Sequence, residues 1–232
     1  MEPSLAIERL FWARGVALVA GIDEAGRGAW AGPVVAAAVV FPSRADLADL
    51  LAGALARDGA VGRAPRSASV RDSKVLSAKQ REMADRAIRQ VASGIGVGIA
   101  PAQVVDELGL SFAGQLAFWR AVRALPEPPS HLLVDGFPLW SMTYPQLAII
   151  DGDARCLSVA AASIVAKVAR DGMMAALDLE TPGYGFAQNV GYGTAAHRRA
   201  LYALGLSPEH RRTYRPLMSL ANGEHGAHDD GR

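Results

Sequence analysis

The chain has 232 residues, half of them hydrophobic, which is enough to bury a substantial core in a single α/β domain. Its 24 basic and 23 acidic residues give a formal net charge of +1, so no global positive field indicates a nucleic-acid partner, and any such surface must be local. The single cysteine, Cys156, excludes an internal disulfide, and the sequence has no Cys/His cluster of the zinc-binding kind, which fits a reducing cytoplasm.

Residues 1–17 are a lead-in ahead of the first predicted strand. The stretch 1–10 mixes Glu2, Glu8 and Arg9 with short apolar runs and lacks the basic-then-apolar pattern of a signal peptide. Throughout the sequence, Gly, Pro or a charge interrupts each apolar run before it reaches about 18 residues, the length that marks a membrane helix. We therefore expect a cytoplasmic protein without a membrane span.

Two adjacent carboxylates follow the first predicted strand. Residues 16–22 and 33–41 are rich in Val and Ala, and their short link predicts two buried antiparallel strands. Because successive strand side chains face opposite sides, Asp23 and Glu24 can serve one site only if the strand ends there and the backbone turns. Glycines on both sides of Arg27, at Gly26 and Gly28, permit that turn and let the backbone approach a ligand closely.

An acidic pair beside a glycine-flanked arginine can hold a cation and an anion side by side. That arrangement suits a metal-dependent enzyme acting on phosphate esters. The alternative is an ordinary solvated turn, because most charged turns carry no function.

A shift in composition toward Ala, Gly, Arg and Asp predicts that residues 43–71 are a surface insertion, with a short helix over 45–56. Ser77 and Gln80 then form a capping-box pattern that starts a helix running to about Ala92. Lys74 lies just before this helix, where a positive side chain and free backbone N–H groups could meet a phosphate. A solvated lysine at a helix start is an equal alternative.

The middle of the chain predicts more strands and helices. Residues 94–100 predict a third strand, Pro101 opens a short helix to about Leu108, and Ser111 caps a further helix that Pro126 ends. Trp119 is expected to be in the core.

Two further apolar runs end in acids. Residues 131–135 end in Asp135, and 147–150 are followed by Asp151 and Asp153. Three strands that end in carboxylates predict that these acids gather at one edge of a mixed sheet. The residues alone favour neither Asp151 nor Asp153.

A long apolar helix is predicted over residues 158–179. On it Ser163, Lys167 and Arg170 are spaced four and three residues apart and therefore share a face. They could support the acidic edge or a scissile phosphate, or they could form an ordinary polar stripe.

The C-terminal part combines aromatic residues, glycines and arginines. Residues 182–194 contain Tyr184 and Tyr192 among glycines, and a helix is predicted over 194–204. Five arginines and one acid, Glu209, lie between Gly191 and Pro216; this local positive patch suits phosphates and stacking on bases, and a charged helix face is the alternative. Residues 221–232 are polar, and we expect a disordered tail.

Several motifs, in the same order along residues 18 to about 216, resemble those of bacterial ribonuclease HII, the type 2 ribonuclease H. They are GIDEAGRG (21–28), DSK (72–74), VDG (134–136), GD (152–153), AAASIVAKV (160–168), YGF (184–186) and GYGT (191–194). The resemblance implies a catalytic domain over 18–220 with an α/β, ribonuclease H-like fold: a five-stranded mixed sheet flanked by helices, with a helical C-terminal extension.

The resemblance also implies an activity. It predicts an endonuclease that cuts the RNA strand of RNA–DNA hybrids and incises on the 5′ side of single ribonucleotides in duplex DNA, by two-metal-ion hydrolysis that leaves 5′-phosphate and 3′-hydroxyl ends. The implied partners are these two nucleic acids, the implied cofactor is Mg²⁺ or Mn²⁺, and we expect a monomer.

The family's functional residues fall on positions of this chain. Its four metal-site carboxylates fall on Asp23, Glu24, Asp135 and Asp153, because Asp151 occupies the place of a lysine in the family's Lys-Gly-Asp pattern. The element that recognises the 2′-hydroxyl falls on Gly26, Arg27 and Gly28, and the tyrosine that packs on the following sugar falls on Tyr192. Lys74, Ser163 and Lys167 are further candidates for substrate contact.

The chain departs from the family pattern at Ala29-Trp30, Val75, Gly109 and Val190. Val75, Val190 and Asp151 each stand where the family usually has a lysine, so these three changes remove positive charge near the expected DNA path. Two other functions are kept as alternatives. One is a nuclease like ribonuclease HIII, which prefers longer RNA tracts, and the other is a non-catalytic module that binds RNA–DNA hybrids.

Overall fold

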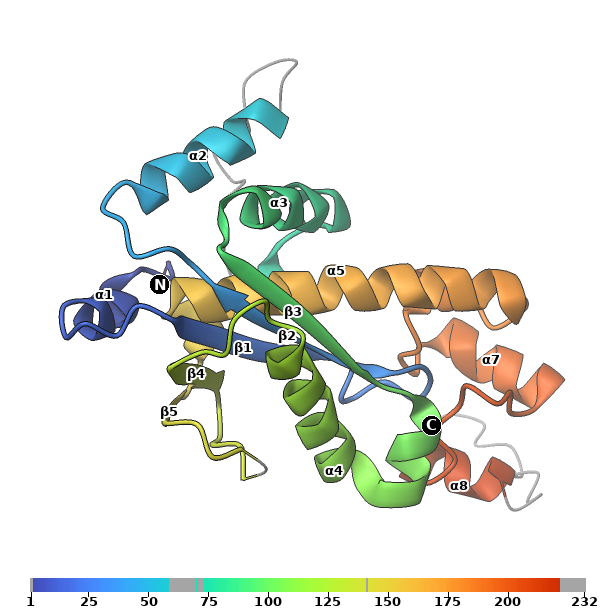
Figure 1. The fold of residues 1–232 in the computed structure, drawn as a ribbon. Helices are drawn as coiled ribbons and strands as arrows, with labels where there is room; N and C mark the ends of the chain where they lie inside the picture. Colours follow the sequence, from blue (N-terminus) through green and yellow to red (C-terminus); the bar gives the residue numbers. More distant parts are fainter. Residues whose placement is uncertain (1, 59–69, 71–72, 141, 222–232) are drawn as a thin grey trace.

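The computed structural model describes residues 2–58, 70, 73–140 and 142–221 (Figure 1). Its strands are β1 Val19–Ala25, β2 Val34–Val40, β3 Gly94–Ala100, β4 His131–Asp135 and β5 Gln146–Ile149. Its helices are α1 Ala6–Trp12, α2 Leu47–Asp58, α3 Ala78–Val91, α4 Ala102–Arg123, α5 Leu157–Glu180, α6 Phe186–Asn189, α7 Ala195–Leu204 and α8 Arg215–Ala221, with short 3₁₀ turns η1 Ser73–Val75 and η2 Gly152–Ala154.

The strands form one mixed sheet in the order β3-β2-β1-β4-β5. The three strands of the first half are antiparallel neighbours, whereas β4 and β5 run parallel to β1. A short link joins the antiparallel strands β1 and β2, whereas α2 and α3 lie between β2 and β3 and α4 connects β3 to β4, the parallel neighbour of β1. The predicted five-stranded mixed sheet is confirmed.

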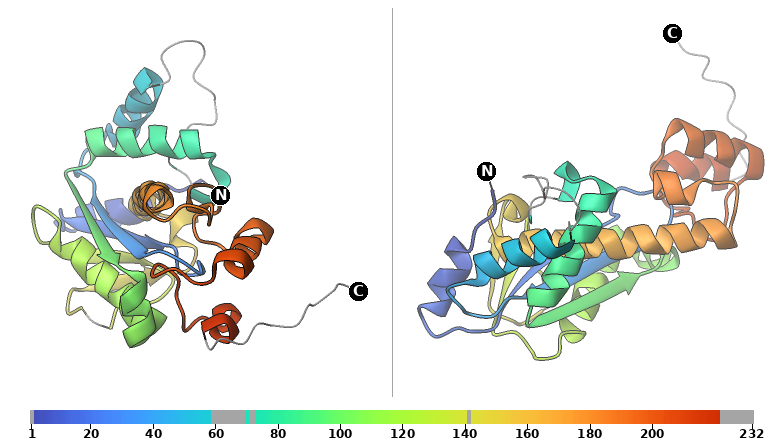
Figure 2. Two further views of the ribbon diagram at one scale, coloured as in Figure 1. Left: turned by 90° about the vertical axis from the view of Figure 1, so that its right-hand side faces the viewer. Right: turned by 90° about the horizontal axis from the view of Figure 1, so that it is seen from above.

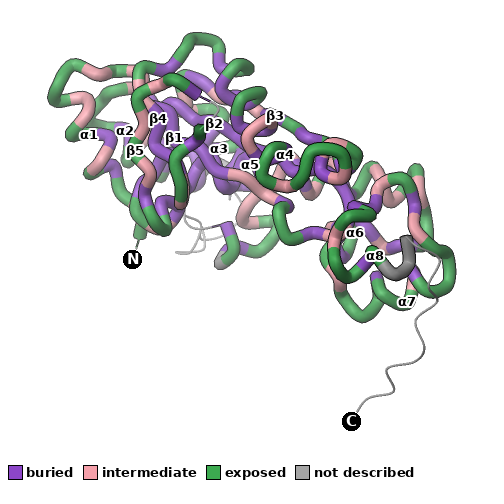
Figure 3. The backbone as a smooth tube through the Cα atoms, turned by 90° about the horizontal axis from the view of Figure 1, so that it is seen from below, coloured by how far each residue is buried: buried purple, intermediate pink, exposed green. Residues whose placement is uncertain are grey.

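Helices cover both faces of the sheet. The long helix α5 packs along β1 and β2 on one face, and α4 packs on β3 and β2 on the other (Figures 1 and 2). Every residue of β2 is buried, so the sheet centre is apolar on both faces (Figure 3). A Cβ at Gly98 of β3 would lie 2.0 Å from the carbonyl oxygen of Ala117, so glycine is what lets α4 lie directly on the strand.

The helix α4 changes direction at Gly109, whose φ of 84° is not helical. The two predicted helices are therefore present as two helical segments that meet at Gly109. In the second segment Trp119 is 45% exposed, with the guanidinium of Arg123 over its ring at 5.2 Å. The expectation that Trp119 is a core residue was wrong, because the buried face of this segment carries Ala113, Ala117 and Ala121 and Trp119 lies on another side.

The described part of the 43–71 segment is packed on the protein. Helix α2 lies outside α3 and contributes the buried side chains of Leu47, Leu51, Ala54 and Leu55 to the core on the α5 side. The rest of the predicted insertion, apart from Val70, lies largely outside the described residues, as does nearly all of the predicted tail at 221–232.

The lead-in 1–17 contains helix α1, which a buried acid holds against α5. Glu8 is 1% exposed, and its carboxylate accepts hydrogen bonds of 2.8 Å from both the backbone N–H and the hydroxyl of Ser158. Near this contact the thiol of Cys156 is fully buried, and burial raises its pKa above the ordinary range.

Two predicted helix starts are confirmed. Ser77 and Gln80 make the reciprocal hydrogen bonds of a capping box at α3. The hydroxyl of Thr194 accepts the backbone N–H of His197 at the start of α7. Helices α6 to α8 gather at the far end of α5 around a small core of their own, which confirms the helical C-terminal part (Figure 2).

No helix among the described residues is long and apolar enough to cross a membrane.

Candidate active site

The candidate site lies where β1 extends beyond its neighbour β4. Parallel pairing between them ends at Ile22 and Val134, whereas β1 continues to Ala25 beside β2. Residues 23–25 therefore have a neighbouring strand on one side only. The strand was expected to end at Asp23 and Glu24; it does not, and the end of β4 provides the opening instead. We call Asp23, Glu24, Asp135 and Asp153 the carboxylate rim.

Asp23 is 6% exposed and is crowded by other acids. Its Oδ1 accepts the backbone N–H of Glu24 at 2.7 Å. Burial, followed by the charges of Glu24 and Asp135, raises the pKa of Asp23 well above its ordinary value, and a hydrogen bond from Ser163 opposes this rise. Burial likewise raises the pKa of Glu24, which is opposed by Arg27, 3.5 Å from Oε1 of that carboxylate.

Asp135 and Asp153 meet through the turn after β5. Oδ1 of Asp135 accepts the backbone N–H of Gly152 at 2.7 Å, which carries Asp153 toward the same edge of the sheet. Burial first, and then the charge of Asp153, raises the pKa of Asp135. Asp153 is buried in η2, whereas Asp151 is exposed in a left-handed conformation with φ of 53°. The geometry thus separates the two acids that the residues alone left open.

Lys74 reaches the rim from η1. Its Nζ lies 3.1 Å from Oδ2 of Asp153, although its side chain is 76% exposed. The charge of Lys74 also opposes the raised pKa values of Glu24 and Asp135. The predicted lysine therefore contacts the acidic edge, not only the start of α3.

The rim is an oxygen donor set of the type that Mg²⁺ and Mn²⁺ prefer. Within the residues that the structure describes, no three acidic, histidine or cysteine side chains converge closely enough to form a finished ion site. Two of the rim carboxylates instead pair with exposed cationic side chains, Glu24 with Arg27 and Asp153 with Lys74. The other two, Asp23 and Asp135, accept backbone N–H groups. The raised pKa values mark a place where added positive charge is favourable, so the residues fit a divalent cation.

Two loops lie beside the rim and are joined to each other. We call residues 26–33 and 189–194 the paired loops. The carbonyl of Gly191 accepts the backbone N–H of Trp30 at 2.8 Å, and the Tyr192 ring lies opposite Gly28, where a Cβ would be 3.9 Å from Cε1 of the tyrosine. The structure therefore places Tyr192 beside Gly28, in the loop that also carries Gly26 and Arg27.

Arg170 is buried between the paired loops. It donates to the carbonyls of Ala31, Pro33 and Val190 at 2.8–3.0 Å, and burial lowers its pKa to about 10, so it stays charged at neutral pH. A Cβ on Gly26, where φ is 92°, would lie 2.0 Å from its Nε, so only glycine fits there. The guanidinium also lies 5.7 Å from the centre of the Tyr192 ring.

Arg211 holds the other side of the first loop. It donates to the carbonyl of Gly32 at 2.9 and 3.0 Å and to that of Arg27 at 2.9 Å. The hydroxyl of Tyr214 donates to the same Arg27 carbonyl. Arg211 is fully buried, so this arginine does not belong to the predicted surface patch; Arg198, Arg199, Arg212 and Arg215 are exposed.

The three polar residues predicted to share a face of α5 serve different places. The hydroxyl of Ser163 lies 3.0 Å from that of Ser73 and bonds to Asp23. Lys167 donates to Asp171 at 2.7 Å and lies 5.9 Å from the Tyr192 ring. Arg170 points inward, as described above.

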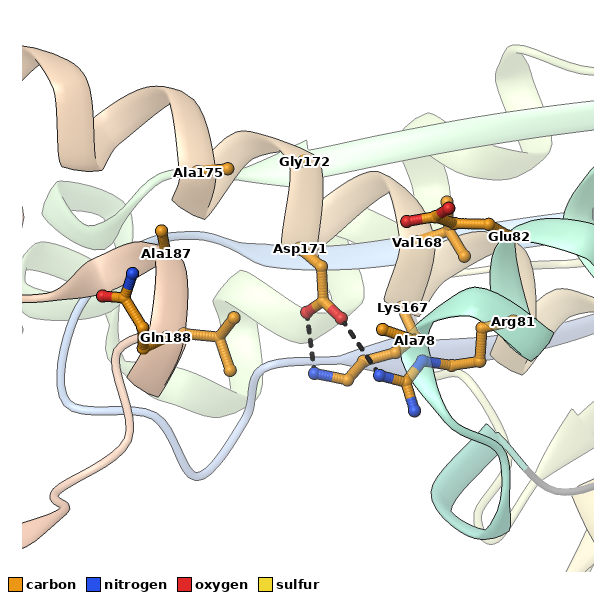
Figure 4. Close-up of a pocket in the computed structure, with 11 residues that line it drawn as sticks. Ala78, Arg81, Glu82, Lys167, Val168, Asp171, Gly172, Ala175, Ala187 and Gln188 are labelled. Atoms are coloured by element: carbon orange, nitrogen blue, oxygen red, sulfur yellow. Dashed lines mark hydrogen bonds and ion pairs between the residues drawn. The ribbon is translucent and has the colours of Figure 1, made fainter.

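A cavity of about 450 Å³ adjoins Lys167 between α3, α5 and α6 (Figure 4). In it Asp171 lies between Lys167 and Arg81, with 3.5 Å to the arginine (Figure 4). Both cations thus share one carboxylate, and the group of three keeps a net charge of +1.

Sequence reasoning missed the roles of Arg170, Arg211 and the buried pair His197 and His210. In the sequence, Arg170 stands out only as one of several polar residues on a helix face, and Arg211 only as one of a cluster of arginines. The two arginines donate to backbone carbonyls up to 184 positions away in the sequence, which no local pattern identifies.

Comparisons with known proteins agree on one family. The family model described as Ribonuclease HII matches residues 20–218. Ribonuclease HII of Chloroflexus aurantiacus is 49% identical over 219 residues, covering 94% of this chain and 96% of the relative. Ribonuclease HII of a Synechococcus species (strain JA-3-3Ab) is 46% identical over 226 residues, covering 97% and 94% respectively.

A solved structure shares the fold. The crystal structure of ribonuclease H2 from Pyrococcus horikoshii OT3 gives a TM-score of 0.67 at 25% identity and covers 89% of this chain and 98% of that one. The predicted ribonuclease H-like fold is therefore confirmed. With the family match over nearly the whole sequence, the chain belongs to the ribonuclease HII family and is a ribonuclease H enzyme.

Proposed function

We propose that the chain is an endonuclease that cuts the RNA strand of RNA–DNA hybrids and incises on the 5′ side of single ribonucleotides in duplex DNA. The cuts leave 5′-phosphate and 3′-hydroxyl ends. The observation that carries the proposal is the joint placement of the carboxylate rim and the paired loops, which puts a phosphate-ester site directly beside a loop suited to reading a sugar. On this proposal the nucleic acids are the partners of a cytoplasmic monomer.

The carboxylate rim is proposed to hold Mg²⁺ or Mn²⁺, two ions during the reaction. When bound there, such ions supply an activated water and neutralise the charge of the departing 3′-oxygen. The chain's own contribution is to place partly buried acids at one edge of the sheet, so that the rim favours positive charge. Lys74 and Arg27 compensate that charge in the structure described here and would release Asp153 and Glu24.

The paired loops are proposed to select the ribonucleotide. A lone ribonucleotide in DNA differs from its neighbours by its 2′-hydroxyl, which can both donate and accept hydrogen bonds. The backbone at Gly26 to Gly28 can read that hydroxyl directly, and Tyr192 opposite Gly28 can pack on the next sugar. Lys74, Ser163 and Lys167 are proposed to support the substrate around the rim.

The decisive test compares two acids at the ends of the neighbouring parallel strands β4 and β5. Asp135→Asn should abolish Mg²⁺-dependent cleavage of a duplex with one embedded ribonucleotide, because it removes a charged oxygen ligand from the rim. The matched control, Asp151→Asn, changes an exposed acid outside the rim and should keep near-normal cleavage. If Asp135→Asn cleaves as fast as Asp151→Asn, the rim takes no part in the reaction. If the wild-type protein cleaves in the presence of EDTA, the reaction does not need a metal ion.

The alternatives differ in their substrates. A preference for a four-ribonucleotide tract over a single ribonucleotide would indicate activity like that of ribonuclease HIII. Metal-independent binding of hybrids without phosphodiester cleavage would indicate a binding module. The relative rates on one and on four ribonucleotides separate these outcomes.

A further inference from the structure

Two histidines that the proposed chemistry does not use lie buried behind Tyr192. His197, in α7, is 0% exposed and His210 is 1% exposed, and their Nε2 atoms are 2.9 Å apart. Aromatic rings surround them: Phe186 meets His197 edge-on at 5.6 Å, and Tyr184 lies 4.9 Å from His210. A pair of imidazoles in such a place must satisfy its ring nitrogens internally.

Backbone groups at both ends of the pair fix where its protons lie. Nδ1 of His197 is 3.0 Å from the carbonyl of Tyr192, which can only accept, so this nitrogen carries a proton. Nδ1 of His210 is 3.0 Å from the backbone N–H of Ser207, which can only donate, so this nitrogen carries none.

The contact between the rings follows from these two ends. In the neutral pair His210 donates through its Nε2–H to the bare Nε2 of His197. All four ring nitrogens are then satisfied, in a chain that runs from Ser207 through His210 and His197 to Tyr192. We call this chain the histidine relay.

The segment that starts the relay also holds the first of the paired loops. His210 is followed directly by Arg211, whose guanidinium donates to the carbonyls of Arg27 and Gly32. The backbone of Gly32 in turn donates to the carbonyl of Glu209 at 2.8 Å. One short segment, residues 207–211, therefore fixes Arg27 on one side and Tyr192 on the other.

We propose that His197 and His210 are positioning residues for ribonucleotide selection, because the relay sets the place of Tyr192 relative to the Gly26 to Gly28 backbone. This inference rests on the proposed function. The gap between Tyr192 and Gly28 is where the sugar next to the ribonucleotide would fit, and displacement of a positioning group by about 1 Å can cost on the order of 100-fold in rate.

The two substrate types should respond differently. A duplex with one ribonucleotide offers a single productive register, so a loosened Tyr192 directly reduces productive binding. A uniform RNA strand offers a ribose in every register and tolerates the same loss. A residue that only stabilises the fold would reduce both activities by the same factor.

The experiment compares three variants by kcat/KM on both substrates, at a temperature where the folded fraction is verified by circular dichroism. His197→Phe keeps a ring and removes the donor to Tyr192; His197→Asn keeps an N–H near the place of Nδ1. His131→Phe is the matched control, since His131 lies in β4 against Phe11, away from the relay. His197→Phe should lose about 10- to 100-fold on the single ribonucleotide and less than about 3-fold on the hybrid.

His197→Asn should restore most of the ratio between the two substrates even though it loses the contact with His210, and His131→Phe should leave that ratio unchanged. Equal losses on both substrates for His197→Phe, or no rescue by His197→Asn, would overturn the proposal.

A second measurement does not depend on activity. In protein labelled with ¹⁵N-histidine, long-range proton–nitrogen spectra at pH 7 should show His197 as the Nδ1–H form and His210 as the Nε2–H form. Other tautomers, or a charged ring, would refute the relay even if the enzyme is active. The predicted tautomers in a protein that does not incise single ribonucleotides would instead count against the proposed function.

Discussion

At the carboxylate rim, burial and neighbouring acids raise the pKa values of Asp23, Glu24 and Asp135. Glu24 and Asp153 are balanced there by exposed cations, Arg27 and Lys74. The paired loops, in contrast, rest on buried groups whose hydrogen bonds are complete: Arg170, Arg211 and the histidine relay. At neutral pH the repulsion between the rim acids therefore lowers the free energy of unfolding, whereas the buried groups that hold the loops raise it. On the proposed function, the loops that would select the sugar are thus held in place before substrate arrives, whereas the ion site would be completed by what binds there.

The largest effect should come from removing one charge of the rim. Asp23→Asn should lower cleavage by about 10³-fold, the scale of losing a main electrostatic contact to the transition state. It should also raise the free energy of unfolding by about 1–2 kcal/mol, because a crowded, buried charge is gone. Urea unfolding without added metal measures the second effect, and a loss of stability would contradict the contrast between the two regions.

Replacing a buried residue that holds the paired loops should destabilise the protein, the opposite of the effect expected at the rim. Arg211→Met removes donors to Arg27 and Gly32 and should lower the free energy of unfolding by about 3 kcal/mol, since the Gly32 carbonyl loses both of its donors and the Arg27 carbonyl keeps only Tyr214. Arg212→Met alters an exposed neighbouring side chain and serves as the control. Equal effects of the two substitutions in urea unfolding would show that Arg211 contributes no more than a surface residue.

Acid should separate the two regions in one experiment. Burial, and then the charge of His197, lowers the pKa of His210 to about 4 from an ordinary value of 6.5. The unfolded chain therefore binds a proton first, so this contribution to stability is complete above pH 6.5 and is lost as the pH falls toward 4, on the order of 3 kcal/mol.

The raised pKa values at the rim have the reverse sign, because protonation of its acids relieves repulsion in the folded state. The free energy of unfolding should therefore fall more steeply between pH 7 and 4 in Asp23→Asn than in the wild type. The variant has lost an acid whose protonation would have offset part of the loss. A shallower dependence in the variant would reverse the assignment.

The smallest effect concerns Val190. This β-branched residue has a φ of 43°, a conformation that glycine adopts without strain. Val190→Gly should keep the carbonyl that Arg170 contacts and stabilise the protein by about 1 kcal/mol or less, which a shift in thermal midpoint would detect. Destabilisation would mean that the valine side chain packs more usefully than its backbone strain costs.

The sequence predicted those parts of the site that depend on local patterns. Strands that end in acids predicted the rim, and glycines around Arg27 predicted the turn at Gly26. The choice between Asp151 and Asp153 needed burial, which spacing does not give. Trp119 was misplaced because small residues, Ala113, Ala117 and Ala121, form the buried face of this helix, whereas its largest apolar side chain lies outside that face.

The support of the paired loops could not be predicted for a different reason. Arg211 and Gly32 are separated by 179 residues, and Arg170 and Ala31 by 139, so their contacts exist only after the sheet and α5 have brought the segments together. A lone sequence shows such arginines as surface charge, and the histidines of the relay as ordinary polar positions.

The burial of Cys156 has a practical consequence for observing this enzyme. Its thiol is fully enclosed, and its raised pKa keeps the reactive thiolate scarce. Because it is the only cysteine of the sequence, a new cysteine at an exposed position such as Arg199 would accept a maleimide dye almost alone. Binding of singly labelled molecules to a nucleic-acid duplex, and their diffusion along it, could then be followed in real time.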